Sequence, residues 1–126
     1  MACGGTLWQD LARQRPGPID HRESAARGER AHLAHPVQPV PGSRLAAILG
    51  RAPLPVNTLH HQGVRAIGHG LQPGAWAADG LCEGLELPDR RFVVAVQWHP
   101  EELFAQQELA HALFSAFCAA ASSGAK

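Results

Sequence analysis

A histidine with a carboxylate two positions after it follows an apolar run near the end of the chain. Residues 92–97 hold four consecutive small β-formers, so we expect a strand that can be buried on both faces, and Pro100 blocks further pairing. Residues two apart in extended chain point the same way, so Glu101 can lie beside the imidazole of His99. A carboxylate there would hold one tautomer and stabilise the imidazolium of a general base. The segment offers no nucleophile.

The same residues also fit a structural interpretation. His99 can be a half-exposed histidine at a strand end, with Glu101 and Glu102 placed at a helix start because acidic side chains favour the positive N-terminal end of a helix. The local sequence leaves both interpretations open, and the rest of the chain has to decide between them.

Length and composition exclude several classes of protein. The chain has 126 residues and 45% hydrophobic content, which predicts one modest domain or part of one. Its 11 basic and 11 acidic residues cancel, so we predict no nucleic-acid partner. The first residues lack the basic and apolar regions of a signal peptide, and no stretch approaches the length of a membrane span. We therefore expect a cytoplasmic protein without a membrane partner.

The cysteines and histidines give little support for a disulfide framework or a metal centre. The 3 cysteines are scattered without a C-x-x-C pair and are predicted to be free thiols: Cys3, Cys82 and Cys118. His32 with His35, or His60 with His61, are conceivable ligand pairs. No cysteine or acidic cluster supports either pair at structural-site spacing, and Pro36 disfavours a helix at the first. We predict no metal site.

Turn residues and periodicity divide the first half of the chain. Residues 14–34 are rich in Pro, Gly, Arg and Glu, and their apolar residues follow neither helical nor strand periodicity. This composition predicts a flexible, solvated loop. Residues 35–40 are expected to form a short edge strand, because 2 prolines exclude them from a central position. Ser43 should cap a helix over 44–49 that Gly50 closes.

The second half alternates strand patterns with turns. Residues 55–57 predict a short strand that leads into a junction with two histidines, and the apolar spacing over 64–71 predicts one or two helical turns. Three strand candidates separated by turn residues predict a small antiparallel meander: 75–77, 81–87 and 92–97. An apolar stripe over 101–121 predicts a single helix docked on this sheet. We expect an ordinary tail over 122–126.

Three sequence blocks together resemble the γ-glutamyl-γ-aminobutyrate hydrolase family, within the class I glutamine amidotransferase-like superfamily. The first is G-G-T-L-W-Q-D-L over residues 4–11, and the second is V-N-T-L-H-H-Q over 56–62. The third joins A-W-A-A-D-G at 75–80 with V-Q-W-H-P-E at 96–101. The resemblance runs over nearly the whole chain, and the blocks are specific in combination.

The resemblance implies a flavodoxin-like α/β fold and a Cys-His-Glu triad that hydrolyses γ-glutamyl amides through a thioester. By position, His99 would be the catalytic base and Glu101 its orienting carboxylate. The substrate would be a small γ-glutamyl amide, as in polyamine catabolism, and no metal or organic cofactor would be required. The second block would lie near the site, so Asn57, His60 and His61 are predicted to bind substrate. A capped histidine pair without such a role is the alternative.

One part of the family pattern is absent from this sequence. The family places its nucleophile in a G-x-C-x-G-x-Q elbow shortly before the first block, whereas only Met1 and Ala2 precede Cys3, so Cys3 is not nominated. We therefore expect residues 1–126 to be the C-terminal part of a flavodoxin-like amidotransferase-type domain, with a small antiparallel meander and a C-terminal helix.

Two functions follow from that expectation. The leading one is a γ-glutamyl amide hydrolase that retains the histidine and glutamate but is inactive without an N-terminal segment carrying the nucleophile. The alternative is a non-catalytic γ-glutamyl-binding or assembly module. In either case the apolar face of the C-terminal helix would meet a truncated sheet, which predicts marginal stability or self-association.

Overall fold

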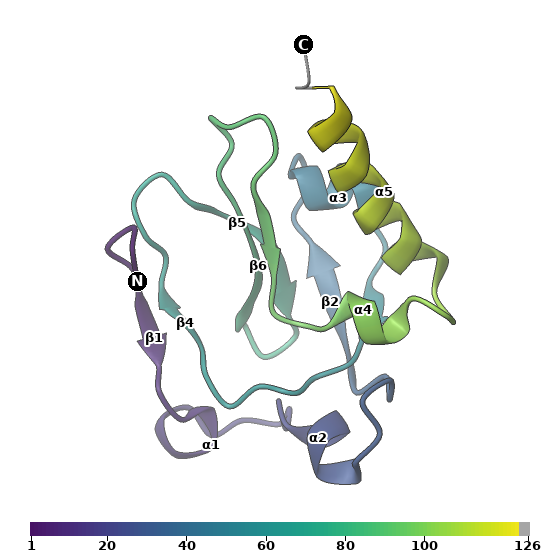
Figure 1. The fold of residues 1–126 in the computed structure, drawn as a ribbon. Helices are drawn as coiled ribbons and strands as arrows, with labels where there is room; N and C mark the ends of the chain where they lie inside the picture. The colour runs from purple at the N-terminus through teal and green to yellow at the C-terminus, as the bar shows by residue number, and fades with distance from the viewer. Residues whose placement is uncertain (124–126) are drawn as a thin grey trace.

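An antiparallel sheet forms the centre of the structure, and the long C-terminal helix packs beside it (Figure 1). The computed structural model describes residues 1–123, and the last three residues of the predicted tail lie outside the described part. The sheet order is β1-β4-β6-β5-β2-β3, with β7 also paired to β6. The strands are β1 (Thr6–Trp8), β2 (His35–Pro39), β3 (Leu54–Val56), β4 (Gly63–Ala66), β5 (Gln72–Ala77), β6 (Cys82–Glu86) and β7 (Val94–Val96).

Five helical segments connect or cover the strands. They are α1 (Leu11–Gln14), α2 (Glu23–Arg27), α3 (Arg44–Leu49), α4 (Pro100–Leu103) and α5 (Glu108–Ser122). The main core lies between the sheet and α3 and α5, and includes Val37, Leu45 and Leu113. A smaller cluster around Leu11 and Leu81 lies near α1. The fold is thus an α/β arrangement with an antiparallel sheet and a C-terminal helix. No helix among residues 1–123 is long and apolar enough to cross a membrane.

The predicted meander is confirmed in its order and direction. β5 pairs with β6, and β6 pairs with β7, in both cases antiparallel. Gly80 adopts a φ of 81° in the turn between β5 and β6, which glycine tolerates without strain. The expectation that residues 92–97 are buried on both faces is wrong, because Val93 is 42% exposed and Ala95 is also exposed.

β2 is an internal strand, so the prediction of an edge strand is wrong. β3 pairs with residues 35–37 and β5 pairs with residues 37–39, and the two partners share only Val37. Each proline therefore lies opposite one neighbour. Pro36 faces Pro55 in β3, and Pro39 faces Ala75 in β5. The missing proline N–H groups are tolerated because the two partners overlap so little.

The apolar spacing over 64–71 does not form the predicted helix. Gly63–Ala66 forms β4, which pairs with both β1 and β6. Val64 lies opposite Leu7 in β1 and Cys82 in β6. Three apolar residues at helical spacing are a weak signal, and long-range strand pairing decides the conformation here.

Residues 14–34 contain regular structure that the sequence did not indicate. Helix α2 lies within this segment, and the side chains of His21 and Ser24 are buried. The Ser24 hydroxyl donates to the carbonyl of His32 and accepts from the backbone N–H of Thr58. The expectation of a fully solvated loop is therefore wrong for the part around α2.

The predicted C-terminal helix is interrupted. α4 ends at Leu103, whose carbonyl accepts from the backbone N–H groups of Gln106 and Gln107, and α5 starts at Glu108. The apolar stripe docks only in part, since Leu113 is buried whereas Phe117 is 57% exposed.

Helix α3 is held on the sheet by a carboxylate of β6. Ser43 caps the helix through the Ala46 N–H, as predicted, and Gly50 follows its end. The buried carboxylate of Glu86 also accepts from the backbone N–H groups of Arg44 at 2.9 Å and Leu45 at 2.8 Å. Four N–H groups at a helix start have no partner within the helix, so Glu86 satisfies a need that the helix itself cannot meet.

We expect Glu86→Ala to lower the free energy of unfolding by about 3 kcal/mol, because two buried N–H groups lose a charged acceptor. Urea denaturation would measure the change. Asp89→Ala removes an exposed carboxylate in the turn after β6 and should change stability by less than about 0.5 kcal/mol. Equal effects of the two variants would contradict this account of α3.

Candidate active site

His99 lies between the end of β7 and the start of α4. Trp98 is buried, and the Gln97 N–H donates to the backbone carbonyl of Glu83 at 2.8 Å, so the chain is held just before the histidine. Pro100 then starts α4, where its missing N–H costs nothing. The Nδ1 atom of His99 lies 2.6 Å from Oε1 of Glu101. The structure therefore brings together the two residues that the sequence predicted as a pair.

The electrostatics of this pair favour an ionised carboxylate. Partial burial raises the pKa of Glu101, but the hydrogen bond and charge of His99, with a smaller effect of Arg30, outweigh it and leave the pKa below its usual value. An ionised Glu101 accepts the proton on Nδ1 of His99. That tautomer leaves Nε2 free to accept a proton, which is the state that a general base requires.

Asn57 holds the backbone of His99. This side chain is fully buried, and its Oδ1 accepts from the His99 N–H at 3.0 Å. Its Nδ2 donates to the carbonyls of His99 at 3.1 Å and Arg30 at 2.7 Å. Since both polar atoms bind the main chain, the geometry gives Asn57 a positioning role. Its predicted contact with substrate stays a prediction.

The structure does not gather the three predicted substrate-binding residues around one point. His60 is buried, and its Nδ1 bonds the carbonyl of Gln62 at 2.8 Å. His61, in contrast, is exposed and lines an open cavity of about 580 Å³ together with residues of α1 and of the segment that leads to α2. Asn57, His60 and His61 thus face three different surroundings.

The cysteines do not contribute a nucleophile to this pair. Cys3 and Cys118 are exposed, whereas Cys82 is buried in β6 and donates to the carbonyl of Gly84 at 3.2 Å. Burial raises the pKa of the Cys82 thiol to about 11, so it is not activated at neutral pH. Within residues 1–123, Glu101 is the side chain that hydrogen-bonds the His99 ring.

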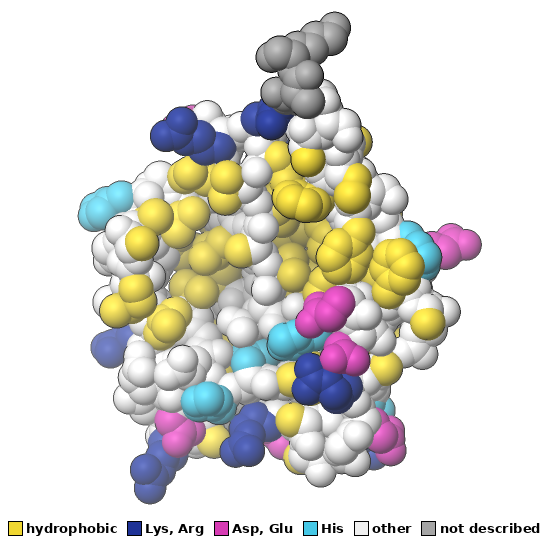
Figure 2. All heavy atoms as spheres, viewed as in Figure 1, with side chains coloured by type: hydrophobic (Ala, Val, Ile, Leu, Met, Phe, Trp, Pro, Cys, Tyr) yellow, Lys and Arg dark blue, Asp and Glu magenta, His cyan; other side chains and the backbone are white. Residues whose placement is uncertain are grey.

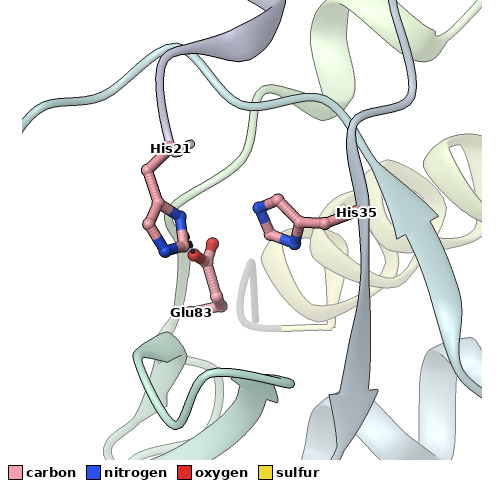
Figure 3. Close-up of side chains that lie close together, drawn as sticks. All are labelled: His21, His35 and Glu83. Carbon is pink, nitrogen blue, oxygen red and sulfur yellow. Dashed lines mark ion pairs between the residues drawn. The ribbon is translucent and has the colours of Figure 1, made fainter. Parts of the chain in front are cut away.

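A second group of titratable side chains lies inside the molecule, and sequence reasoning missed it. Figure 3 shows the rings of His21 and His35 turned towards the carboxylate of Glu83, which comes from β6. The Oε1 atom of Glu83 lies 3.3 Å from Nδ1 of His21 and 3.5 Å from Nε2 of His60. The ring centroids of His21 and His60 are 4.9 Å apart. We call His21, His35, His60 and Glu83 the histidine cluster.

The reason for this omission is the sequence distance between the members of the cluster. The histidine pairs that the sequence suggests as metal ligands are close in the chain, whereas Glu83 comes from a distant strand. The available signal was an acidic residue inside the otherwise apolar strand candidate 81–87. A glutamate in such a strand is rarely buried without a partner.

Charges in the cluster compensate one another. Burial lowers the pKa of His21, but the close carboxylate of Glu83 and the hydrogen bond to Asp79 outweigh this effect and raise the pKa above 6.5. Burial raises the pKa of Glu83, but the close rings of His21 and His60 outweigh this effect and lower the pKa below its usual value. Asp79 has its own cation, since its Oδ2 lies 3.0 Å from Nη1 of Arg15.

Comparison with known proteins assigns the family. The model of the Peptidase C26 family matches residues 1–101. The chain therefore belongs to the Peptidase C26 family, a group of class I glutamine amidotransferase-like hydrolases. The family resemblance seen in the sequence is thus confirmed.

Three relatives illustrate this assignment. A putative glutamine amidotransferase of Schizosaccharomyces pombe is 40% identical over 90% of this chain and 43% of its own length. A putative glutamine amidotransferase of Mycobacterium tuberculosis is 40% identical over 92% of this chain and 36% of its own length. The γ-glutamyl-γ-aminobutyrate hydrolase of Escherichia coli is 34% identical over 95% of this chain and 48% of its own length. The chain spans less than half the length of these relatives.

Replacing Asn57 should disturb both stability and the position of His99. We expect Asn57→Asp to lower the free energy of unfolding by about 3 kcal/mol, because it places a charge against two carbonyl oxygens. Urea denaturation and the amide resonance of His99 would report the change. Gln106→Glu makes the same chemical change at an exposed amide that donates to Ala31, and should cost less than about 1 kcal/mol.

The contact between His99 and Glu101 should be visible in the titration of Glu101. We expect His99→Gln to raise the pKa of Glu101 towards its ordinary value, because the main group that lowers it is removed. In the unaltered chain, the contact contributes its full stabilisation of the fold at pH values above the ordinary pKa of glutamate. This contribution is lost as the pH falls through the lowered pKa of Glu101. Carboxyl ¹³C NMR would measure this, with His111→Gln on an exposed part of α5 as the control. An unchanged titration of Glu101 in His99→Gln would contradict the pairing.

Proposed function

We propose that this chain supplies the histidine and the orienting carboxylate of a γ-glutamyl amide hydrolase with a Cys-His-Glu triad. The observation that carries the proposal is the 2.6 Å contact between His99 Nδ1 and Glu101 Oε1, held by the amide of Asn57 behind it. Membership in the Peptidase C26 family and the name of the Escherichia coli relative support a γ-glutamyl amide as the substrate class.

In the proposed reaction, His99 moves one proton in each direction. Its Nε2 takes the proton of a cysteine thiol, and the resulting thiolate attacks the γ-carbonyl carbon of the substrate. The imidazolium, stabilised by Glu101, returns the proton to the departing amine, which leaves a γ-glutamyl thioester. The same imidazole then activates water to release glutamate and the thiol.

We propose that the thiol comes from a segment that the longer relatives possess and that precedes the region matched here. In this proposal, residues 1–126 are the C-terminal part of a flavodoxin-like domain. An apolar hollow beside β7 and α5 supports the proposal of a further segment. Hydrophobic side chains gather on this face in Figure 2, and the hollow is lined by Phe92, Val94, Val96, Pro100, Leu113, Phe114 and Phe117.

Of the three residues predicted to bind substrate, His61 has the surroundings that fit the role best. It is exposed and lies on the open cavity beside α1, whereas Asn57 and His60 are buried with their own partners. We therefore propose that His61 contacts the γ-glutamyl group, with Asn57 acting on His99 from behind.

The test joins this chain to the N-terminal part of the Escherichia coli relative, which the family resemblance implies should carry the G-x-C-x-G-x-Q elbow. We expect the joined protein to hydrolyse γ-glutamyl p-nitroanilide and the chain alone to show no turnover. In the joined protein, His99→Gln and Glu101→Gln should each lower kcat by at least about 100-fold. The first variant removes the base that transfers the proton, and the second removes the carboxylate that orients this base.

The matched control is Glu102→Gln. Glu102 is the next residue of α4 and pairs with Arg30 at 2.5 Å instead of with His99, so this variant should retain most of the activity. Turnover by the chain alone that Cys3→Ala abolishes would overturn the proposal. Saturable binding of γ-glutamyl-γ-aminobutyrate without turnover in the folded, joined protein would instead favour a non-catalytic binding module.

A further inference from the structure

The histidine cluster contains an unusual number of buried polar atoms without a hydrogen-bond partner. His21, His35, His60 and Glu83 are 5%, 6%, 8% and 1% exposed. Nδ1 of His21, Nε2 of His35, Nε2 of His60 and both carboxylate oxygens of Glu83 lack a hydrogen bond of acceptable geometry. An unsatisfied buried polar atom destabilises the fold, so five of them at one place need an explanation.

The opposite nitrogen of each ring is already bonded, and this determines where the free lone pairs are. The outer contacts are His21 Nε2 to Asp79 Oδ2 at 3.0 Å, His35 Nδ1 to the carbonyl of Pro36 at 3.2 Å, and His60 Nδ1 to the carbonyl of Gln62 at 2.8 Å. A carbonyl oxygen only accepts, so His35 and His60 carry their proton on Nδ1. Their Nε2 atoms then present lone pairs to the interior.

This arrangement matches the surroundings of metal-binding histidines. Such histidines almost always donate their second ring N–H to a carboxylate or a backbone carbonyl, which orients the other nitrogen towards the ion. All three rings of the cluster have this outer contact, and the three come from different parts of the chain. In Figure 3 the rings of His21 and His35 lie on either side of the Glu83 carboxylate.

Within the described part of the chain, Glu83 has no permanently charged cation as a partner. Arg15 pairs with Asp79, but no lysine or arginine among residues 1–123 forms a salt bridge with Glu83. With neutral rings, nitrogen lone pairs would face the carboxylate of Glu83 and repel it. A positive charge between these atoms, from a bound ion or from added protons, removes the repulsion.

The distances fit a metal ion better than a single proton. The ligand atoms of His21, His35 and Glu83 lie within 4.8 Å of one another. Two contacts, at 3.3 Å and 3.5 Å from Glu83 Oε1, are close to the spacing of about 3.3 Å between ligands of a tetrahedral zinc ion. A proton shared by two atoms leaves the other unpartnered atoms unsatisfied, whereas one ion can bind several of them.

We propose that His21, His35, His60 and Glu83 bind one divalent transition-metal ion, with Zn²⁺ as the best match. Three imidazoles and one carboxylate are a donor set that suits zinc, and this site uses none of the atoms of the His99–Glu101 pair. His21 also lines the open cavity beside α1, which gives the ion a route from solvent. The ion would tie together the segment before α2, β2, β6 and the connection between β3 and β4.

The experiment uses the full chain after dialysis against EDTA, titrated with Co²⁺ as a spectroscopic substitute for zinc. We expect one equivalent of Co²⁺ to bind with the intense visible absorption of tetrahedral coordination, and one equivalent of Zn²⁺ to displace it. Bound Zn²⁺ should also raise Tm, because an ion that binds only the folded chain stabilises it. Absence of stoichiometric binding would overturn the proposal.

Variants locate the ion. We expect His35→Gln to weaken Co²⁺ binding by at least about 100-fold, since it removes a direct ligand. The matched control is His32→Gln, which alters a histidine that contacts the partly exposed carboxylate of Glu23 outside the cluster and should leave the affinity unchanged. If His32→Gln abolishes binding, the ion lies at that surface position and the proposal is wrong.

A measurement on the unaltered chain tests the proposal even if His35→Gln does not fold. Imidazole ¹⁵N NMR should show Zn²⁺-dependent shifts of Nε2 in His35 and His60, with protons retained on Nδ1. Doubly protonated rings that do not respond to Zn²⁺ would overturn the proposal and assign the positive charge to protons.

Discussion

The structure depends on strand β6, which places a buried carboxylate on each face of the sheet. Gly84 and Glu86 face α3, and a Cβ atom built on Gly84 would lie 2.6 Å from a methyl group of Leu45. Glu83 points to the opposite face, towards the histidine cluster. Buried carboxylates are tolerated only with partners, so each one recruits a separate part of the chain. Glu86 accepts hydrogen bonds from the start of α3, and Glu83 lies beside three histidines.

β6 also connects this interior to the candidate active site. The backbone carbonyl of Glu83 accepts from Gln97, two residues before His99, so one residue contributes to both places through different atoms. Asn57 supplies the second support of His99 from the end of β3. The proposed catalytic histidine is therefore positioned by two separate strands, β6 and β3, while only its pairing with Glu101 is local.

The elements that sequence analysis predicted correctly are those decided by near neighbours in the chain. Ser43 caps α3 through a residue three positions away, and Gly80 closes the turn of the meander with a backbone conformation that glycine readily adopts. The contact of His99 with Glu101 belongs to the same group, because the two residues are only two positions apart in the chain. The errors over β2 and β4 arise where distant strand partners determine the conformation. The break before α5 is a local turn at the Leu103 carbonyl that the apolar stripe did not indicate.

The amino-acid sequence by itself determined the family, the meander, the cap of α3 and the adjacency of an imidazole and a carboxylate at a strand end. These features depend on residue types and short spacings, which a single sequence displays directly. Only the tertiary structure decided that β2 is internal, that Asn57 holds the backbone of His99 and that three histidines surround Glu83. Those arrangements depend on hydrogen bonds and desolvation between residues far apart in the chain, and no local pattern records which distant groups will meet.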